Sequence, residues 1–584
     1  MLLFYKTELN MTPDILRKRI EIAQGKRLAD TVIKNAKIVN VYSHDITEGD
    51  IAISDGIIAG IGTYSGVNEI NADGCYAIPG LIDSHIHIES SFLSPEEFGK
   101  MVVPFGTTTI IADPHEIVNV CGEEGFRYML EAAKRTALDI KFMVPSCVPC
   151  SPFENSGAVI DAKTVAELLQ NENVVGLAEF MNYVGVINGD EECLNKISAA
   201  LNQNKRIDGH APGLLGVGRQ AYISTGILTD HECSTIEEMQ QSIANGMFVE
   251  LRNGSACHNL WVLIKGITPN NSRRCLLCSD DMQPVTIFEN GHINGDIKAC
   301  VAGGLDPITA IQMGSLNAAE CYGLTDRGAI SAGKRADIVL TDNLTDFNVR
   351  KVFINGTLTA ENGTYLPAIT KQDISAVSGS VHIDKFSSDK LRLPLSSQNV
   401  KAIGIIPGNI VTKCINAEVT IGDDGCFQFD PKHDIVKIAV IERHHNTGNV
   451  GLGLLTGYGI RHGAIAITIA HDSHNIIAVG VSDEEMTLAI KTLAEQGGGI
   501  VLVKDGKVLD SMPLPIAGLM SDKDARTVEA NLKRINTAAH EQLGVDTYIE
   551  PISTLCFMSL PVIPELKVTD KGLFDVRRFE FTEI

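Results

Sequence analysis

The sequence predicts an α/β protein built around a (β/α)8, TIM-like barrel, with a small β-sandwich formed from both flanks of the barrel and a C-terminal α+β domain. Four observations predict this fold class. Strand and helix patterns alternate from about residue 81 to 328, and polar, ligand-type side chains recur where the strands end. Short strands separated by turn residues flank that region. A chain of 584 residues is also too long for a single core.

Eight short apolar runs in the central region are the predicted barrel strands. Amphipathic segments such as Glu124–Lys134 and Ala162–Gln170 lie between several of them, and eight strand–helix units in about 250 residues is the usual size of such a barrel. The predicted strands are Leu81–Asp83, Thr107–Ala112, Ile140–Val144, Val174–Glu179, Arg206–His210, Gly226–His231, Met247–Leu251 and Cys275–Asp280.

The flanks of the barrel are predicted to form the β-sandwich together, from residues 1–80 and 329–370. A surface helix at about 14–25 precedes short strands that turn residues such as Asn35 separate. After the barrel, residues 328–340 indicate two short strands around a turn. The barrel itself is assigned to 81–328.

The C-terminal domain is predicted over residues 380–584, after a linker at Ser375–Ser380. It contains predicted strands at Val400–Ile405 and Ile435–Glu442 and a Gly-rich stretch without the Lys-Ser/Thr of a P-loop. His471 and His474 follow an apolar run there. They are expected either to make a hydrogen-bonded turn or to belong to a lid that covers the barrel mouth and donates one of them to the substrate.

Charge and composition restrict the partners. The net charge of −23, with no basic run, argues against nucleic acid and anionic membranes. No apolar stretch approaches the length of a membrane span, and residues 1–5 are too short for a signal-peptide core. The expected location is the cytoplasm. Fourteen cysteines in a chain this long do not suggest a disulfide framework.

Two histidines stand one residue apart after the first barrel strand. Alternate side chains of a strand share a face, so His85 and His87 point the same way and can bind one metal ion. Further ligand types follow later strands, at the rim where barrel enzymes build their sites. These are Asp113 and His115 after the second strand, Glu179 at the fourth, His210 at the fifth, His231 at the sixth, and Asp280 and Asp281 at the eighth.

Several stretches resemble a known family. Pro79-Gly80-Leu81-Ile82-Asp83-Ser84-His85-Ile86-His87, the rim ligands and the Gly328–Val339 motif resemble the amidohydrolase superfamily, whose barrels are of the metal-dependent hydrolase type. More specifically, the chain is similar to the bacterial adenine deaminases, in the C-terminal domain as well. The stretches that carry this resemblance are 112–116, 208–213, 229–232, 279–281, 470–477 and 514–521.

The residue at the end of the fourth strand indicates which members of the superfamily the chain resembles. Many members that act on cyclic amides carry a carboxylated lysine there, whereas this chain has Glu179. The resemblance implies two divalent metal ions bridged by Glu179, with Mn2+ or Fe2+ as the usual occupants and Zn2+ as an alternative. One ion would be held by His85, His87, Glu179 and Asp280, and the second by Glu179, His210 and His231.

The resemblance also implies hydrolysis of adenine to hypoxanthine and ammonia, in purine salvage. A metal ion lowers the pKa of bound water to about 7, and the resulting hydroxide would attack C6. Asp280 is the expected general base, with its neighbour Asp281 as the rival. Asp113 and Glu116 are expected to handle protons or contact the substrate, and His115 to contact the substrate or to be a loop residue. Glu89 and Glu232 are expected to be solvated or to orient ligand imidazoles.

Two other functions are also compatible with the sequence. One is another amidohydrolase that acts on a cyclic amide, against which the absence of the strand-four lysine counts. The other is a non-catalytic barrel scaffold, which would be expected to lack ligands that are all present here. Adenine and water are the expected partners, and a homo-oligomer, a dimer or larger, is expected because association is common for barrels of this size.

Overall fold

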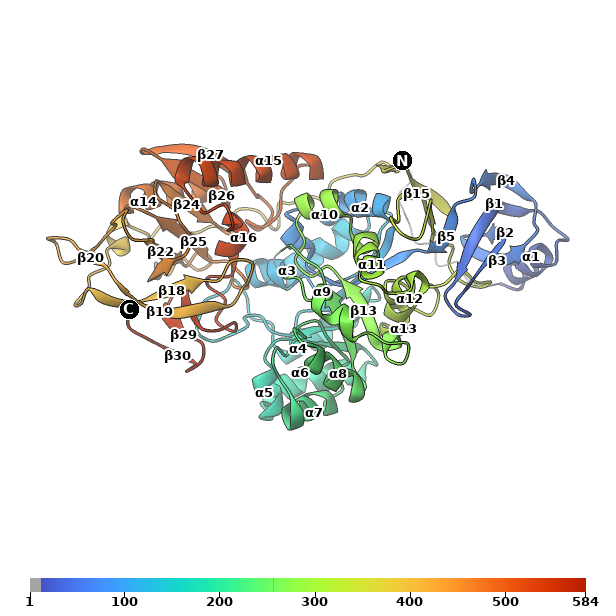
Figure 1. The fold of residues 1–584 in the computed structure, drawn as a ribbon, viewed down its shortest axis with the longest axis horizontal. Coiled ribbons are helices and arrows are strands. Elements are labelled where there is room, and N and C mark those ends of the chain that lie inside the picture. Colours follow the sequence, from blue (N-terminus) through green and yellow to red (C-terminus); the bar gives the residue numbers. More distant parts are fainter. Residues whose placement is uncertain (1–11, 256) are drawn as a thin grey trace.

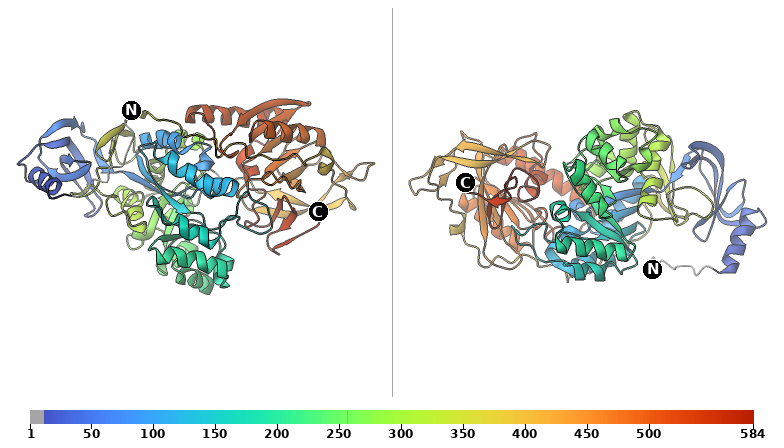
Figure 2. Two further views of the ribbon diagram at one scale, coloured as in Figure 1. Left: turned by 180° about the vertical axis from the view of Figure 1, so that it is seen from behind. Right: turned by 90° about the horizontal axis from the view of Figure 1, so that it is seen from below.

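The structure is a computed structural model that describes residues 12–255 and 257–584. An N-terminal β-sheet lies at one end, the barrel in the middle and the C-terminal region at the other end (Figure 1). The views from behind and from below show the same row of three parts (Figure 2). Residues 1–5, which were expected to be too short for a signal-peptide core, lie outside the described residues.

Strands from both flanks of the barrel form one nine-stranded sheet, preceded by the helix α1 (Pro13–Ala23), which begins after Thr12. The strand order is β17-β16-β15-β14-β5-β1-β2-β3, with β4 paired to β1. The strands are β1 (Ala29–Asn40), β2 (Asp45–Ser54), β3 (Ile57–Gly62), β4 (Gly66–Asn71), β5 (Tyr76–Pro79), β14 (Ile338–Thr341), β15 (Val349–Ile354), β16 (Thr357–Glu361) and β17 (Thr364–Tyr365). The antiparallel pairing of β14 with β5 joins the two flanks.

Two local expectations for this sheet are wrong. Asn35 does not end a strand: it sits at φ +57° in a bulge of β1, whose first half pairs with β4 and whose second half pairs with β5. Asparagine tolerates this left-handed conformation, so the long strand bends without breaking. The first of the two strands predicted over 328–340 is absent: residues 329–337 form a loop, in which Arg335 makes a β-bridge to Ile57. The second predicted strand is β14.

Eight parallel strands form the barrel in the order of the sequence, close to the predicted bounds. They are β6 (Leu81–Ile86), β7 (Thr107–Ala112), β8 (Asp139–Val144), β9 (Val174–Phe180), β10 (Arg206–Gly209), β11 (Thr229–Asp230), β12 (Phe248–Arg252) and β13 (Cys275–Cys278). Backbone hydrogen bonds close the ring at two places: Leu228 N–H donates to Ile207 O (2.9 Å), and Asp280 N–H donates to His85 O (3.0 Å). The predicted fold class is confirmed.

Helices surround these strands. Their inner faces carry apolar residues at helical spacing, as on the long helix α3, where Phe126 and Met129 are buried. The helices are α2 (Pro95–Val102), α3 (His115–Ala133), α4 (Ala162–Leu168), α5 (Tyr183–Ile187), α6 (Glu191–Asn202), α7 (Gly216–Ser224), α8 (Ile236–Ala244), α9 (Leu260–Leu263), α10 (Pro284–Asn290), α11 (Ile293–Ala302), α12 (Pro307–Met313) and α13 (Leu316–Cys321).

The C-terminal region is built on an eight-stranded sheet in the order β19-β18-β23-β22-β25-β24-β26-β27. One of its faces is covered by the apolar side of α14, including Met486 and Leu493. The elements are β18 (Asn399–Ile405), β19 (Thr412–Glu418), β20 (Thr420–Ile421), β21 (Phe427–Gln428), β22 (Ile435–Ile441), β23 (Val450–Thr456), β24 (Ala464–Ile467), β25 (Ile476–Gly480), α14 (Asp483–Glu495), β26 (Gly499–Lys504), β27 (Lys507–Pro513), α15 (Ala525–Ala538), α16 (Pro551–Cys556), β28 (Leu566–Thr569), β29 (Gly572–Asp575) and β30 (Glu580–Phe581).

This region is packed onto the barrel. One buried apolar cluster contains Phe92 of the barrel together with Ile469 and Leu514 of the C-terminal region. The predicted linker is part of the contact, since Val377 is buried and its carbonyl accepts a hydrogen bond from Ala517 N–H (2.6 Å). A buried apolar contact of this kind favours a fixed placement over a hinged one. Among the described residues, no helix has the length and apolar character needed to cross a membrane.

Candidate metal centre and active site

The six residues expected to hold metal meet at the carboxyl ends of the barrel strands. The pleat of β6 places His85 and His87 on one face, as expected. Their partners come from the ends of β9, β10, β11 and β13, which converge because the strands are parallel and closed into a ring. All of these side chains are buried except that of His210, which is partly exposed. The set is His85, His87, Glu179, His210, His231 and Asp280.

The carboxylate of Glu179 lies between two pairs of histidines. Its Oε1 is 3.3 Å from His87 Nε2 and 3.9 Å from His85 Nε2. Its Oε2 is 2.6 Å from His210 Nδ1 and 3.2 Å from His231 Nε2. Burial opposes ionisation of Glu179, but His210 and His231 outweigh it and hold the pKa of the carboxyl well below its usual range. Each oxygen thus serves one histidine pair, which is the arrangement of a bridging carboxylate.

Asp280 and Asp281 are adjacent in the sequence but make different contacts in the structure. Asp280 Oδ1 is 3.2 Å from His87 Nε2 and 3.4 Å from His85 Nε2, whereas Oδ2 accepts a hydrogen bond from Arg252 Nη1 (2.6 Å). The backbone of Asp280 is left-handed at φ +55°, a strained conformation for a residue other than glycine. Asp281 instead accepts a hydrogen bond from Ser90 and lines a pocket.

The donor atoms fit divalent metal ions. His85 Nε2 is buried and has no hydrogen-bond partner in the described part of the chain, although it points at two carboxylates. His87 Nδ1 lies 3.0 Å from the carbonyl of Asp113, which leaves Nε2 as the ligand nitrogen. Imidazole and carboxylate donors suit Mn2+, Fe2+ and Zn2+. An unpaired buried nitrogen is costly without an ion, so a metal explains it better than a structural role does.

Asp113, His115 and Glu116 continue the polar cluster away from the rim. His115 is buried and is not a simple loop residue: its Nδ1 is 3.0 Å from Asp113 Oδ2 and 3.6 Å from Glu179 Oε1. Its Nε2 is 3.5 Å from Glu116 Oε1. Glu116 in turn contacts both His471 and His474 of the C-terminal region. The expected hydrogen-bonded turn is present, since His474 N–H donates to Ala470 O (2.7 Å), and the same loop also reaches the barrel mouth through Glu116. Donation of one of these histidines to the substrate stays a prediction.

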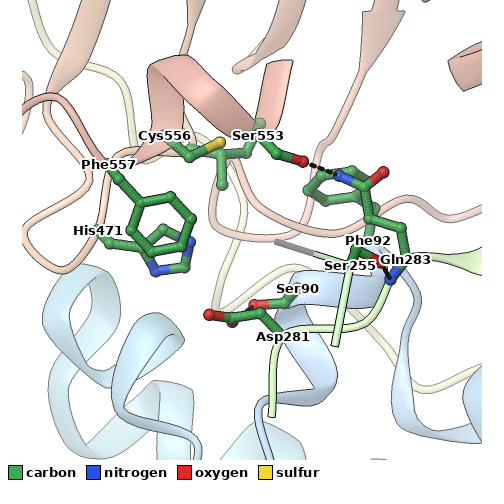
Figure 3. Close-up of a pocket in the computed structure, with 10 residues that line it drawn as sticks. Ser90, Phe92, Ser255, Asp281, Gln283, His471, Ser553, Cys556 and Phe557 are labelled. Carbon is green, nitrogen blue, oxygen red and sulfur yellow. Dashed lines mark hydrogen bonds between the residues drawn. The ribbon is translucent and has the colours of Figure 1, made fainter. Parts of the chain in front are cut away.

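A pocket lies beside this cluster, between the barrel rim and α16 (Figure 3). The barrel supplies Ser90, Phe92, Ser255, Asp281 and Gln283, and the C-terminal region supplies Ile469, His471, Ser553, Cys556 and Phe557. Gln283 Nε2 donates a hydrogen bond to Ser553 Oγ (2.8 Å), which closes the pocket on one side. The ring of His471 stacks on Phe557, with centroids 4.5 Å apart.

Sequence reasoning missed part of this site. Arg252 is not among the predicted site residues, yet it donates hydrogen bonds to both Glu232 and Asp280 at 2.6 Å. Glu232 is buried, 3.6 Å from His231 Nε2, so it is not solvated. The pocket wall of α16 was also missed, because Ser553 and Phe557 carry no motif. The acid-and-arginine pattern at the ends of β11 and β12 was the one signal that could have revealed the Arg252 contacts.

The barrel and its rim define the class of protein first: this is an amidohydrolase, and the amidohydrolase family model matches residues 76–359. A second model, the adenine deaminase C-terminal domain, matches residues 409–580. The chain is 55% identical over 98% of its length to "Adenine deaminase 2" of Desulfotalea psychrophila, all of which is covered. It is 49% identical over 97% of its length to "Adenine deaminase" of Ligilactobacillus salivarius, of which 98% is covered. The chain belongs to the adenine deaminase family, which confirms the resemblance.

Proposed function

We propose that this chain hydrolyses adenine to hypoxanthine and ammonia, a step of purine salvage. Its membership of the adenine deaminase family supports the substrate, and the position of Glu179 between two histidine pairs supports the chemistry most directly. Phe92 and Phe557 line the pocket and give it aromatic surface on which a planar purine can stack. The pocket adjoins the rim at Asp281, so a base bound there would lie next to the neighbour of Asp280, whose carboxylate faces His87.

We propose two divalent metal ions, Mn2+ or Fe2+, with Zn2+ as an alternative. His85, His87, Glu179 and Asp280 would hold one, and Glu179, His210 and His231 the other. Ions at this site would acidify water to a pKa of about 7, so that a nucleophile exists at neutral pH. Arg252, shared by Glu232 and Asp280, compensates the negative charge on that side of the site.

Side chains of the site are proposed to transfer protons, to orient the histidines and to exclude water. Asp280 is proposed as the general base, since its Oδ1 faces the same space as His85 and His87, while Arg252 fixes Oδ2. Asp113 holds His115 and, through its carbonyl, orients His87. Gln283 and Ser553 join the barrel to α16 and restrict the entry of bulk water.

Metal removal and reloading test this function. Protein stripped of metal is expected to release no ammonia from adenine, and reloading with Mn(II) under low oxygen is expected to restore release with about two ions per chain, as a two-metal site requires. Ammonia and bound metal are both measured. Metal without turnover of adenine would contradict the proposal and favour a cyclic amide, which the same assay with hydantoin and allantoin would reveal. A folded protein with neither metal nor turnover would favour the scaffold.

The pocket wall supplied by α16 has its own test. Phe557→Ala removes an aromatic surface from the pocket and from the ring of His471. We expect KM for adenine to rise about 10- to 100-fold, which corresponds to about 1.5 to 3 kcal/mol for a lost buried side-chain contact. Steady-state kinetics measure it. The matched control is Phe579→Ala, because Phe579 is 52% exposed and lies outside the pocket. An unchanged KM in the first variant would exclude Phe557 from substrate binding.

We further propose a homo-oligomer, a dimer or larger, in the cytoplasm. Subunit association is common for barrels of this size, and the acidic net charge of −23 is that of a protein kept away from nucleic acid and anionic membranes. Analytical ultracentrifugation of the metal-loaded protein tests the assembly: a monomer at all concentrations would contradict it.

A further inference from the structure

Glu116 of α3 lies between two histidines that come from the other end of the chain. Its Oε1 pairs with His471 Nδ1 and its Oε2 pairs with His474 Nε2. All three side chains are buried. The two histidines occupy the loop between β24 and β25, which the packing of the C-terminal region presses against the barrel mouth. The three residues therefore form one hydrogen-bonded unit across the contact between the two parts.

The protonation of His474 follows from its neighbours. The backbone N–H of Ala470 donates to His474 Nδ1 (3.0 Å), and an amide N–H can only donate. His474 Nδ1 is thus an acceptor, so the hydrogen of the neutral ring sits on Nε2 and is donated to Glu116. Both nitrogens of His474 are used within the protein. This histidine can fix the carboxylate of Glu116, but it has no nitrogen left for a substrate or a metal ion.

His471 differs from His474 in this respect. Its Nδ1 is held by Glu116, its ring stacks on Phe557, and the side chain lines the pocket (Figure 3). No hydrogen bond within the described residues occupies Nε2, which is the ring nitrogen left for a molecule in the pocket. A carboxylate that holds one imidazole nitrogen while the other faces the substrate is the arrangement of an oriented acid–base catalyst.

We propose that His471 is a catalytic residue of the deamination, which donates the proton that purine N1 needs, while Glu116 and His474 are its positioning residues. The role rests on the proposed function. When the water oxygen bonds to C6, the electron pair of the C6–N1 double bond moves to N1, and His471 Nε2 gives N1 its proton. Asp280 transfers one water proton to the amine, which leaves as ammonia with the electron pair of the C6–N bond. The remaining hydroxyl proton is lost as the carbonyl of hypoxanthine forms and restores His471.

The charges around His471 suit a proton donor. It faces Glu116 from α3, Asp281 from the end of β13, and Asp472 and His474 from its own loop. Burial alone would lower the pKa of His471, but the Glu116 carboxylate and the other acids outweigh it and raise the pKa to about 9. The imidazole is then protonated at neutral pH, and kcat should fall as the pH rises past this value, because the donor form is lost.

Three variants test the proposal with adenine as substrate and Mn(II)-loaded protein. His471→Gln should lower kcat about 10²- to 10⁴-fold, as loss of a general acid does, with bound metal unchanged. Glu116→Gln should shift the alkaline limb of the kcat profile to lower pH, because the carboxylate that raises the pKa of His471 is gone. His474→Gln, which keeps an N–H for Glu116, should cost less than His471→Gln. The control is His433→Gln, whose side chain is 53% exposed.

Further measurements distinguish a catalytic role of His471 from a structural one. Imidazole added to His471→Ala should restore part of kcat if the residue transfers a proton, and should do nothing if the residue only supports the fold. A His471→Gln variant that keeps full metal and near-normal kcat would overturn the proposal, as would equal losses in His471→Gln and His474→Gln without imidazole rescue. A loaded wild-type protein that releases no ammonia from adenine would instead overturn the proposed function itself.

Discussion

Glu179→Gln is expected to reduce bound metal from about two ions per chain to at most one, and to lower kcat by more than about 100-fold. Loss of a residue that merely orients a metal ligand costs about 10- to 100-fold, so loss of a bridging ligand should cost more. The amide keeps the shape of the side chain, but its nitrogen cannot accept from the histidines that face Oε1 and Oε2. Metal analysis and ammonia release measure the two effects.

The control for this substitution is Glu124→Gln, on the exposed side of α3, where the carboxylate pairs with Arg127. It should leave metal content and kcat as they are. Two ions per chain and normal turnover in Glu179→Gln would contradict the bridging role. One ion with full turnover would show that a single metal suffices.

Asp280→Asn is expected to lower kcat about 10²- to 10⁴-fold, the usual contribution of a general base. Burial opposes ionisation of Asp280, but Arg252 and the neighbouring histidines hold the pKa of the carboxyl well below its usual range. Asparagine has neither the negative charge nor the basicity of the Asp280 carboxylate. KM should change much less than kcat, because Asp280 faces His85 and His87 and Asp281 lines the pocket.

Steady-state kinetics on metal-loaded protein measure this difference, with Asp346→Asn on the exposed surface as the matched control. If Asp280→Asn kept both metal and near-normal kcat while Asp281→Asn lost turnover, the base would be Asp281. Equal loss of metal and activity in Asp280→Asn would make Asp280 a ligand without a separate role in proton transfer.

Much of the fold could be predicted from local patterns. The period of the apolar runs located the eight barrel strands to within a few residues, because a buried parallel strand must be apolar along its length. The pleat of β6 was sufficient to place His85 and His87 on one face. The position of Glu179 at the end of the fourth strand, where a lysine stands in many cyclic-amide hydrolases, was visible in the sequence alone.

Local patterns failed where a distant partner decides the outcome. Asn35 looks like a turn residue, but β4 and β5 pair with either side of it and keep β1 continuous. Residues Ser375–Ser380 look like a linker, but Val377 is buried against the C-terminal region. Hydrogen bonds and apolar burial between remote segments override local preference in both places.

The sequence by itself determined the barrel, the polar residues at its rim and the family of this protein, since these follow from strand periodicity and from motifs a few residues long. Only the tertiary structure decided that Asp280 rather than Asp281 faces the histidines, that Arg252 joins them, and that Glu116 meets His471 across 355 residues of chain. Asp280 and Asp281 face different groups because the backbone is left-handed at Asp280. Glu116 and His471 meet only after the C-terminal region packs on the barrel mouth. Both are properties of the closed fold, which no local spacing encodes.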